Sequence, residues 1–261
     1  SDLSGPKDPA QTVNWRELHQ RSCQAANLFR ALGVTSGDVV AFVLPNCLET
    51  SYVLLGGMMA GIVNPINPLL EPEQIAAILR ETGARVVVTL KSFPKTDVAQ
   101  KVAEAVRHAT HVTTVLEIDL NSYLTPPKSW IVPFVRPKNP GNHHATVMNF
   151  VTEMKKHNTR LDFENVQQDR VGAYFHTGGT TGMPKVAQHL CSGMIYNGWL
   201  GDTLLFDETD NIMCPLPMFH VFAVHVILMA ALSSGAQVVF PTPAGYRGEG
   251  VFDNFWKLIE R

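Results

Sequence analysis

The sequence lacks the features that mark several common protein classes. It has four cysteines in 261 residues, and none of them form the Cys-x-x-Cys spacing of zinc sites and redox motifs. The longest apolar runs, residues 52–63 and 221–232, contain glycine or histidine and are shorter than the ~20 residues that cross a bilayer. Internal repeats and low-complexity tracts are also missing. We therefore expect reduced thiols, no transmembrane segment and a cytoplasmic location.

An excess of charge of one sign is also lacking. The chain has 21 basic and 23 acidic residues, a formal net charge of −2. Binding of nucleic acid requires clustered lysine and arginine, so no nucleic-acid partner is expected. Hydrophobic residues make up 45% of the chain and charged residues 17%, which excludes a disordered polypeptide. The length allows one large domain or two of ordinary size.

The first half of the chain alternates apolar runs of strand length with patterns of helical spacing. Expected helices cover residues 14–33, 48–60, 72–83 and 97–108, and expected strands cover residues 39–44, 62–66, 85–90 and 112–118. This alternation is typical of βαβ units. It predicts an α/β fold with mostly parallel sheets and helices on both faces.

The second half begins after a proline-rich stretch. Residues 126–140 contain five prolines, so regular structure is not expected there. Beyond them we expect helices at 146–157, 192–206 and 219–232, strands at 170–176, 212–214 and 237–240, and a last helical pattern from 251. We predict two α/β subdomains, residues 1–165 with a proline-rich excursion near 120–145, and residues 166–261.

One loop carries the strongest chemical signal of the sequence, Thr177-Gly178-Gly179-Thr180-Thr181-Gly182-Met183-Pro184-Lys185. Its glycines allow close approach of the backbone, adjacent N–H groups can point at an anion, and Lys185 supplies a positive charge. Pro184 before the lysine and Val186 after it distinguish the loop from a Walker motif. The loop suits a polyphosphate; the alternative is a flexible surface turn.

Residues 175–185 resemble the signature loop of the adenylate-forming (ANL) superfamily, which includes acyl- and aryl-CoA synthetases, firefly-type luciferases and peptide-synthetase adenylation domains. Further similarities to the superfamily occur at residues 15–18, 32–40, 44–46, 60–68 and 215–222. The resemblance covers nearly all of the chain except residues 120–165, a stretch that looks longer than is usual in the family. The chain is most similar to the acyl-CoA synthetase (AMP-dependent synthetase and ligase) branch.

This resemblance implies a two-step reaction. A carboxylic acid attacks the α-phosphate of Mg²⁺-bound ATP to give an acyl-adenylate and pyrophosphate, and the thiol of coenzyme A then takes the acyl group. The expected partners are therefore a small carboxylic acid, ATP and coenzyme A, with Mg²⁺ as the metal that accompanies ATP. The resemblance implies contacts to the β- and γ-phosphates from Thr177, Gly178, Gly179, Thr180, Thr181, Gly182 and Lys185.

The segment at residues 217–222 resembles one wall of the family's acyl pocket. The resemblance implies that His220 is a catalytic and substrate-binding residue beside the carboxylate, and that Phe222 and Val226 face the acyl group. The alternative for His220 is a partly buried structural imidazole. Residues 219–224 contain no carboxylate that could pair with a substrate ammonium. We therefore expect a carboxylic acid that lacks an α-amino group and is otherwise apolar, such as a fatty acid.

No metal site is predicted from the histidines. His220 and His225 are five residues apart, a spacing that directs the two side chains to different sides of a helix. The adjacent His143 and His144 have no cysteine or suitably spaced acid nearby, and we interpret them as part of a solvated loop. Tyr196 and Trp199 could line an acyl tunnel, but their spacing favours packing in the core.

Several family segments are not found after Lys185, namely those that bind adenine, ribose and magnesium and the C-terminal lid with its catalytic lysine. We therefore expect the N-terminal portion of such an enzyme, without the lid domain and inactive by itself. Two other functions stay open. One is a nucleotide-binding module without catalysis, and the other is an adenylation domain that loads a different acceptor.

Overall fold

The computed structural model describes residues 11–137, 141–165, 168–177, 185–243, 245–248 and 251–259. Within these residues, seven strands form one sheet in the order β5-β4-β3-β1-β2-β6-β7, and β8 and β9 form a second, parallel pair. The strands of the large sheet are β1 (Val39–Val43), β2 (Ile62–Pro65), β3 (Val86–Leu90), β4 (Thr114–Ile118), β5 (Thr146–Asn149), β6 (Val171–Thr177) and β7 (Lys185–Leu190). All neighbours in it are parallel except β6 and β7.

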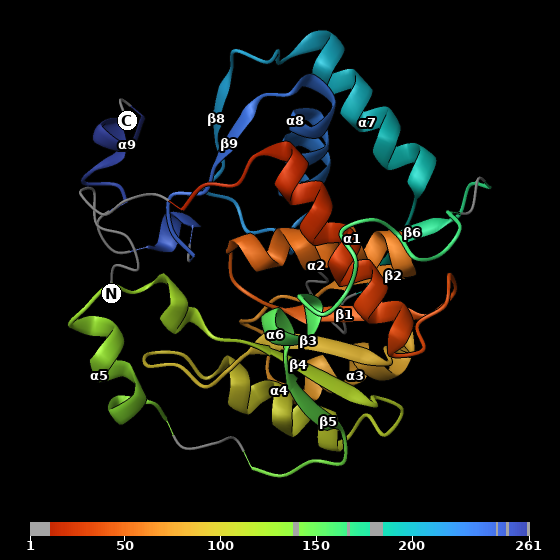
Figure 1. Cartoon of the computed structure of the whole chain (residues 1–261), viewed down its shortest axis with the longest axis vertical. Helices are drawn as coiled ribbons and strands as arrows, with labels where there is room; N and C mark the ends of the chain where they lie inside the picture. Colours follow the sequence, from red (N-terminus) through yellow and green to blue (C-terminus); the bar gives the residue numbers. More distant parts are fainter. Residues whose placement is uncertain are drawn as a thin grey trace.

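Helices cover the large sheet from both sides (Figure 1). On one side lie α1 (Trp15–Ala31) and α2 (Leu48–Ala60), and on the other lie α3 (Pro72–Thr82) and α4 (Val98–Arg107). The smaller sheet of β8 (Asn211–Met213) and β9 (Gln237–Val239) stands beside α7 (Cys191–Leu204) and α8 (Met229–Ser234). The remaining elements are α5 (Lys128–Val135), α6 (Phe150–Met154), α9 (Phe255–Ile259), a π-helical stretch (Ala223–Leu228) and short turns of 3-10 helix. The predicted α/β architecture is confirmed.

Local signals in the sequence account for the helix ends. The Oδ1 atom of Asn14 accepts a hydrogen bond of 2.8 Å from the backbone N–H of Glu17 and so caps α1. Helix α3 begins with Pro72 at its first turn and ends at Gly83, whose φ of 65° lies in the left-handed region that glycine adopts readily. These helices therefore begin and end where the sequence predicts.

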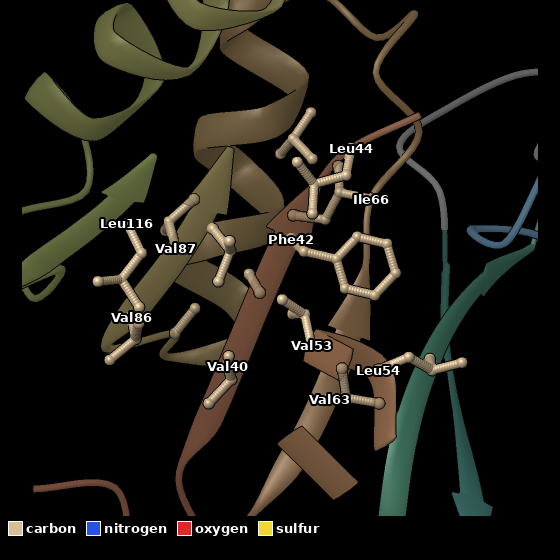
Figure 2. Packing of buried hydrophobic residues seen from close by; sticks show 14 of the residues in the cluster. Val40, Phe42, Leu44, Val53, Leu54, Val63, Ile66, Val86, Val87 and Leu116 are labelled. Atoms are coloured by element: carbon tan, nitrogen blue, oxygen red, sulfur yellow. The ribbon is translucent and has the colours of Figure 1, made fainter. Parts of the chain in front are cut away.

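The central strands are buried on both faces. Every residue of β1 and of β3 is buried, which explains why both read as continuous apolar runs and not as alternating patterns. Figure 2 shows Val40, Phe42 and Leu44 along β1, with Val63 and Ile66 on the side of β2. Figure 2 also shows side chains from β3 and β4 on the opposite side. This cluster is the core of the molecule.

The predicted helix at residues 146–157 is wrong. Residues Thr146–Asn149 form β5, which pairs in parallel with β4, and only Phe150–Met154 are helical. The helical spacing was misleading because Phe150 and Met154, four residues apart, are both fully buried on one face of the short α6. Asn149 separates the two elements, since its Oδ1 atom accepts a hydrogen bond of 2.8 Å from the N–H of Thr152.

The proline-rich excursion contains a helix that was not expected. Helix α5 includes Pro133, which has no N–H to donate to the carbonyl oxygen of Ser129 four residues earlier. The Nδ2 atom of Asn121 donates to that oxygen over 3.1 Å. A contact from another element therefore replaces the missing helical hydrogen bond, and the sequence of α5 alone does not reveal it.

The large sheet continues past residue 165. Strand β6 pairs with β2, and β7, which was not predicted, pairs with β6. The division into subdomains 1–165 and 166–261 stays a prediction, and the first strand outside the large sheet is β8. Among the described residues, no helix combines the length and the apolarity needed to traverse a bilayer.

The contact between α1 and α2 provides a test of the packing. A Cβ atom at Gly56 would lie 2.7 Å from the Cβ of Ala25 and 2.8 Å from the carbonyl oxygen of Ser22. We expect Gly56→Ala to lower the free energy of unfolding by about 1 to 3 kcal/mol, because overpacking outweighs the better helix propensity of alanine.

Gly193 offers the matched control, since it also lies in a helix but a Cβ there would meet no described atom within 4 Å beyond the backbone of its own helix. Gly193→Ala should raise the free energy of unfolding by about 0.5 to 1 kcal/mol. Urea titrations of both variants measure the difference. Equal effects of the two substitutions would show that α1 and α2 are not packed as described.

Candidate functional site

The two ends of the glycine-rich loop lie side by side. Thr177, the last residue of β6, is paired with Lys185, the first residue of β7, in an antiparallel register. The Oγ1 atom of Thr177 also donates a hydrogen bond of 3.4 Å to the carbonyl oxygen of Lys185. The predicted phosphate contacts at Gly178, Gly179, Thr180, Thr181 and Gly182 lie outside the described residues. The described flanks define a hairpin whose ends place an exposed hydroxyl and an exposed ammonium next to each other.

This hairpin begins at the carboxyl end of β6. Strand β6 runs parallel to β2, and β2 runs parallel to β1, so the carboxyl ends of these three strands lie along the same edge of the sheet. Ligands of open parallel sheets bind at this edge, because the loops that leave it surround a crevice. The candidate site is therefore the carboxyl edge around β1, β2 and β6.

Asn46 joins the smaller sheet to this edge. Its side chain, only 3% exposed, follows β1 and donates from Nδ2 to the carbonyl oxygen of Leu216 over 2.8 Å. Its Oδ1 atom accepts from the N–H of Met218, also over 2.8 Å, and its own N–H donates to the carbonyl oxygen of Pro243 over 3.0 Å. One buried amide thus holds the segment that leads to His220.

The three residues predicted to contact substrate lie together after this segment. His220 is exposed, Phe222 is 47% exposed and Val226 is partly exposed. The N–H of Phe222 donates to Nδ1 of His220 over 3.3 Å. An Nδ1 atom that accepts a hydrogen bond leaves the proton of a neutral imidazole on Nε2, where it can serve as a donor to a ligand. His220 is exposed, whereas the alternative of a structural imidazole expects it to be partly buried.

The helical segment after His220 packs against the hairpin. The ring of His225 lies 4.7 Å from that of His189 on β7 and 5.7 Å from that of Phe175 on β6, measured between centroids. His225 belongs to a π-helical stretch, Ala223–Leu228, a type of distortion frequent at functional sites. The flanks of the predicted phosphate loop and the predicted acyl wall are therefore parts of one packed unit.

Polar atoms left without partners lie in this unit. His225 is only 7% exposed, and its Nε2 atom has no hydrogen-bond partner among the described residues. Burial, together with the neighbouring His189, lowers the pKa of His225 to about 4. Removal of the imidazolium from water explains the direction of this shift. His225 is consequently neutral at pH 7.

A second histidine next to the loop is also held neutral. The Nδ2 atom of Asn64, on β2, donates to Nε2 of His176 over 2.8 Å and to the carbonyl oxygen of Tyr174 over 3.1 Å. Burial lowers the pKa of His176 to about 4. Its Nδ1 atom therefore carries the proton, and this atom has no partner among the described residues. This Nδ1–H group belongs to the residue that directly precedes the glycine-rich loop.

A family model described as AMP-binding enzyme matches residues 3–261. The chain belongs to this family. The match extends over the residues before α1 and through the proline-rich excursion, where the sequence motifs were weakest. It confirms the predicted membership of the adenylate-forming superfamily.

Known members of the family support this placement. The marinolic acid–CoA ligase of Pseudoalteromonas sp. (strain SANK 73390) is 30% identical over 262 residues, covering 97% of this chain and 37% of that protein. The long-chain-fatty-acid–CoA ligase of Salmonella typhimurium is 27% identical over 237 residues, covering 87% of this chain and 41% of that protein. The chain therefore spans well under half the length of these curated relatives.

A solved structure of the family has the same fold. The anthranilate CoA ligase AuaEII, solved in complex with anthranoyl-AMP, superposes with a TM-score of 0.73 at 20% sequence identity. The superposition covers 94% of this chain and 41% of the AuaEII chain. The α/β fold with a mostly parallel sheet thus matches the N-terminal part of the adenylate-forming fold.

In this member of the family, sequence motifs pointed to the loop and His220 but not to the residues that join them. Asn46 was noticed within a motif, but its role as a link became visible only in the structure. His225 gave no signal, because one histidine in an apolar helix can lie in any core. The prediction that Tyr196 and Trp199 pack in the core is wrong, since the two side chains are 57% and 52% exposed; their rings contact each other in a tilted arrangement, with centroids 5.6 Å apart.

The lowered pKa of His225 predicts how stability depends on pH. The unfolded chain takes up a proton at this histidine near pH 6.5, whereas the folded chain does so only near pH 4. The stabilisation is therefore complete above pH 6.5 and is lost as the pH falls from 6.5 to 4. Allowing for partial solvent access, we expect His225 to account for a loss of about 1 to 3 kcal/mol.

His225→Phe should reduce the slope of the unfolding free energy against pH in this interval, while the new ring keeps the contact with Phe175. Urea titrations between pH 4 and pH 7.5 measure the slope, with the exposed His19→Phe as the control. An unchanged slope for His225→Phe would contradict the burial of a neutral imidazole at this position.

Proposed function

We propose that the chain supplies the phosphate-binding and acid-binding portion of an AMP-forming acid–CoA ligase. In this proposal a non-amino carboxylic acid, fatty or otherwise apolar, is activated by ATP to an acyl-adenylate and then passed to coenzyme A. The observation that carries the proposal is the packing of the hairpin of β6 and β7 against the helical segment that follows His220, at the carboxyl edge of a parallel sheet. The names of the relatives, which include ligases of marinolic and long-chain fatty acids, support the reaction class.

The described residues suit the first half-reaction. Lys185 and the hydroxyl of Thr177 lie together at the base of the loop, where they can stabilise the charge that builds up on a leaving pyrophosphate. His220, with its Nε2–H directed away from the bond at Nδ1, can donate to the carboxylate or to the acyl-adenylate carbonyl. A donor placed there orients the acid for attack on the α-phosphate.

Mg²⁺ enters the proposal from the family resemblance alone, and coenzyme A from that resemblance and the names of the relatives. Within the part of the chain that the structure describes, no group of three histidine, cysteine or acidic side chains could hold a metal ion. We assign the ion to the phosphates of ATP, since Mg²⁺ in such sites needs only one or two carboxylates besides phosphate oxygens and water. We further propose that residues 1–261 alone form no acyl-CoA. Release of AMP from this chain in the presence of acid, ATP and coenzyme A would contradict that statement.

The lysine at the base of the loop is the first test of the proposed function. Lys185→Ala should weaken the binding of ATP or inorganic tripolyphosphate by about 1.5 to 3 kcal/mol, the contribution of a charge-assisted contact. Calorimetric titration of the chain measures this directly, with the exposed Lys155→Ala as a control that keeps the net charge of the two variants equal. Equal affinities for the two variants would remove Lys185 from the phosphate site.

The acyl wall predicts the class of acid. Between Phe219 and Ser234 the chain has no acidic residue, so an α-ammonium placed against Phe222 and Val226 would lose water without gaining a counter-charge, at a cost of several kcal/mol. A methylene chain would instead gain about 0.8 kcal/mol for each buried CH₂ group.

A substrate panel tests this preference in a ligase that contains this chain together with the segments that complete the fold in its relatives. We expect kcat/KM for fatty, alicyclic or aromatic acids to exceed kcat/KM for α-amino acids of similar size by at least about a hundredfold. A panel led by an amino acid would contradict the assignment of this segment as an apolar acyl wall.

A further inference from the structure

Helix α5 presents an unusual outer face. Four of its eight residues are large apolar side chains that point into solvent, with exposed fractions of 69% for Trp130, 51% for Ile131, 89% for Phe134 and 56% for Val135. Trp130 and Phe134 are four residues apart, as are Ile131 and Val135, so they form two adjacent rows on the helix. Val132 alone is buried within α5. The helix therefore turns its larger apolar face away from the core.

This face is held in a fixed position. Val132 packs into the core cluster, and Asn121 binds the carbonyl oxygen of Ser129 near the beginning of the helix. After the helix, Arg136 donates to both carboxylate oxygens of Asp119, over 3.0 and 2.9 Å, and to the carbonyl oxygen of Ser92 over 2.7 Å. Figure 1 shows α5 at the margin of the molecule. Its exposure is thus a property of an anchored element.

The chain around α5 is positively charged. Between residues 120 and 152 there is no aspartate or glutamate, while Lys128, Arg136 and Lys138 are basic. Asp119 offsets the charge of Arg136, but Lys128 is exposed at the start of the helix. The whole chain carries a formal charge of −2, so the positive charge of this stretch is a local feature. An anionic surface is the complementary partner.

The size and shape of the face select among possible partners. A helix of eight residues is about 12 Å long, whereas a stable protein interface requires about 800 Å² and about 20 to 30 residues from each partner. A dimer formed through this face would likewise bury too little surface to be stable. Side chains that protrude as far as Phe134 fit a fluid surface, which deforms around them and needs no matching shape. Trp and Phe beside lysine are typical of helices that lie in a lipid–water interface.

We propose that α5 anchors the protein to an anionic lipid surface, with Trp130, Ile131, Phe134 and Val135 inserted among the lipids and Lys128 facing the headgroups. Attraction of lysine to anionic headgroups adds to the burial of the apolar side chains. The anchor lies on the membrane and does not span it. This inference is independent of the proposed ligase function.

Co-sedimentation of the 261-residue chain with vesicles tests the proposal. The chain should bind vesicles of phosphatidylcholine mixed with phosphatidylglycerol, and should bind vesicles of phosphatidylcholine alone more weakly. The double variant W130A/F134A should lower the partition coefficient at least about tenfold, since two aromatic side chains no longer leave water. Circular dichroism and melting temperature verify the fold, which these exposed residues should not affect.

A matched control comes from α7, where Tyr196 and Trp199 are also exposed aromatic residues on a helix that has no lysine or arginine and contains Asp202. Y196A/W199A should change the partition coefficient less than about twofold. A second variant, K128E, should weaken binding to the anionic vesicles while leaving binding to phosphatidylcholine nearly unchanged. Together the variants separate insertion of the aromatic side chains from attraction of the charge.

The position of Trp130 can be read from fluorescence. Brominated lipids should quench tryptophan emission of the chain, and most of this quenching should be lost in W130F. Three results would overturn the proposal. The first is no binding to anionic vesicles, the second is an equal loss in Y196A/W199A, and the third is a dimer in solution that W130A/F134A dissociates while vesicle binding is absent. The third result would assign the face to a second copy of the chain.

Discussion

Because β1 and β3 are apolar on both faces, each strand has to be covered from both sides of the sheet. The helices that cover them also return the chain to the same end of the sheet, so β1, β2, β3 and β6 run in one direction. Their carboxyl ends consequently meet at one edge. The flanks of the glycine-rich loop, Asn46 and the residues after β2 are gathered there although they lie far apart in the sequence. The position of the candidate site is thus a consequence of how the core is buried.

Two contacts then connect this edge to the smaller sheet. Asn46 satisfies both of its amide atoms on the backbone of the segment before His220, which is an arrangement that a buried amide requires. The ring contacts of His225 with His189 and Phe175 join the following helix to the hairpin. A displacement of either element would leave polar groups buried without partners or open a void. The geometry between the hairpin of β6 and β7 and the proposed acid site is therefore maintained by packing distributed over both elements.

The proposed acid site and the proposed lipid-binding face of α5 lie on different parts of the protein, but both concern apolar ligands. An apolar acid concentrates in lipid, so a ligase held at a bilayer through α5 would encounter such a substrate at high local concentration. The anchored helix depends on Asn121, which replaces the hydrogen bond that Pro133 cannot make. In the same way, the neutral state of His176 depends on burial beside Asn64. In both places, contacts with a neighbouring element determine the local property, namely the helical conformation around Pro133 and the neutral state of His176.

Much of the fold could be predicted from the sequence, because the strands β1 to β4 and the helices between them have continuous apolar runs, caps and glycine stops that act locally. The glycine-rich loop was predicted from residue type and spacing, and His220 from the resemblance of residues 217–222 to a family segment; the roles of both stay predictions. The helix α5, the strands β5 and β7 and the role of His225 could not. The edge strands β5 and β7 have mixed patterns and form because β4 and β6 offer backbone groups for hydrogen bonding. Helix α5 forms because Asn121 binds its free carbonyl oxygen and Val132 packs into the core. The sequence by itself determined the elements whose stability is local, and the tertiary structure decided those whose hydrogen bonds and apolar contacts come from distant residues.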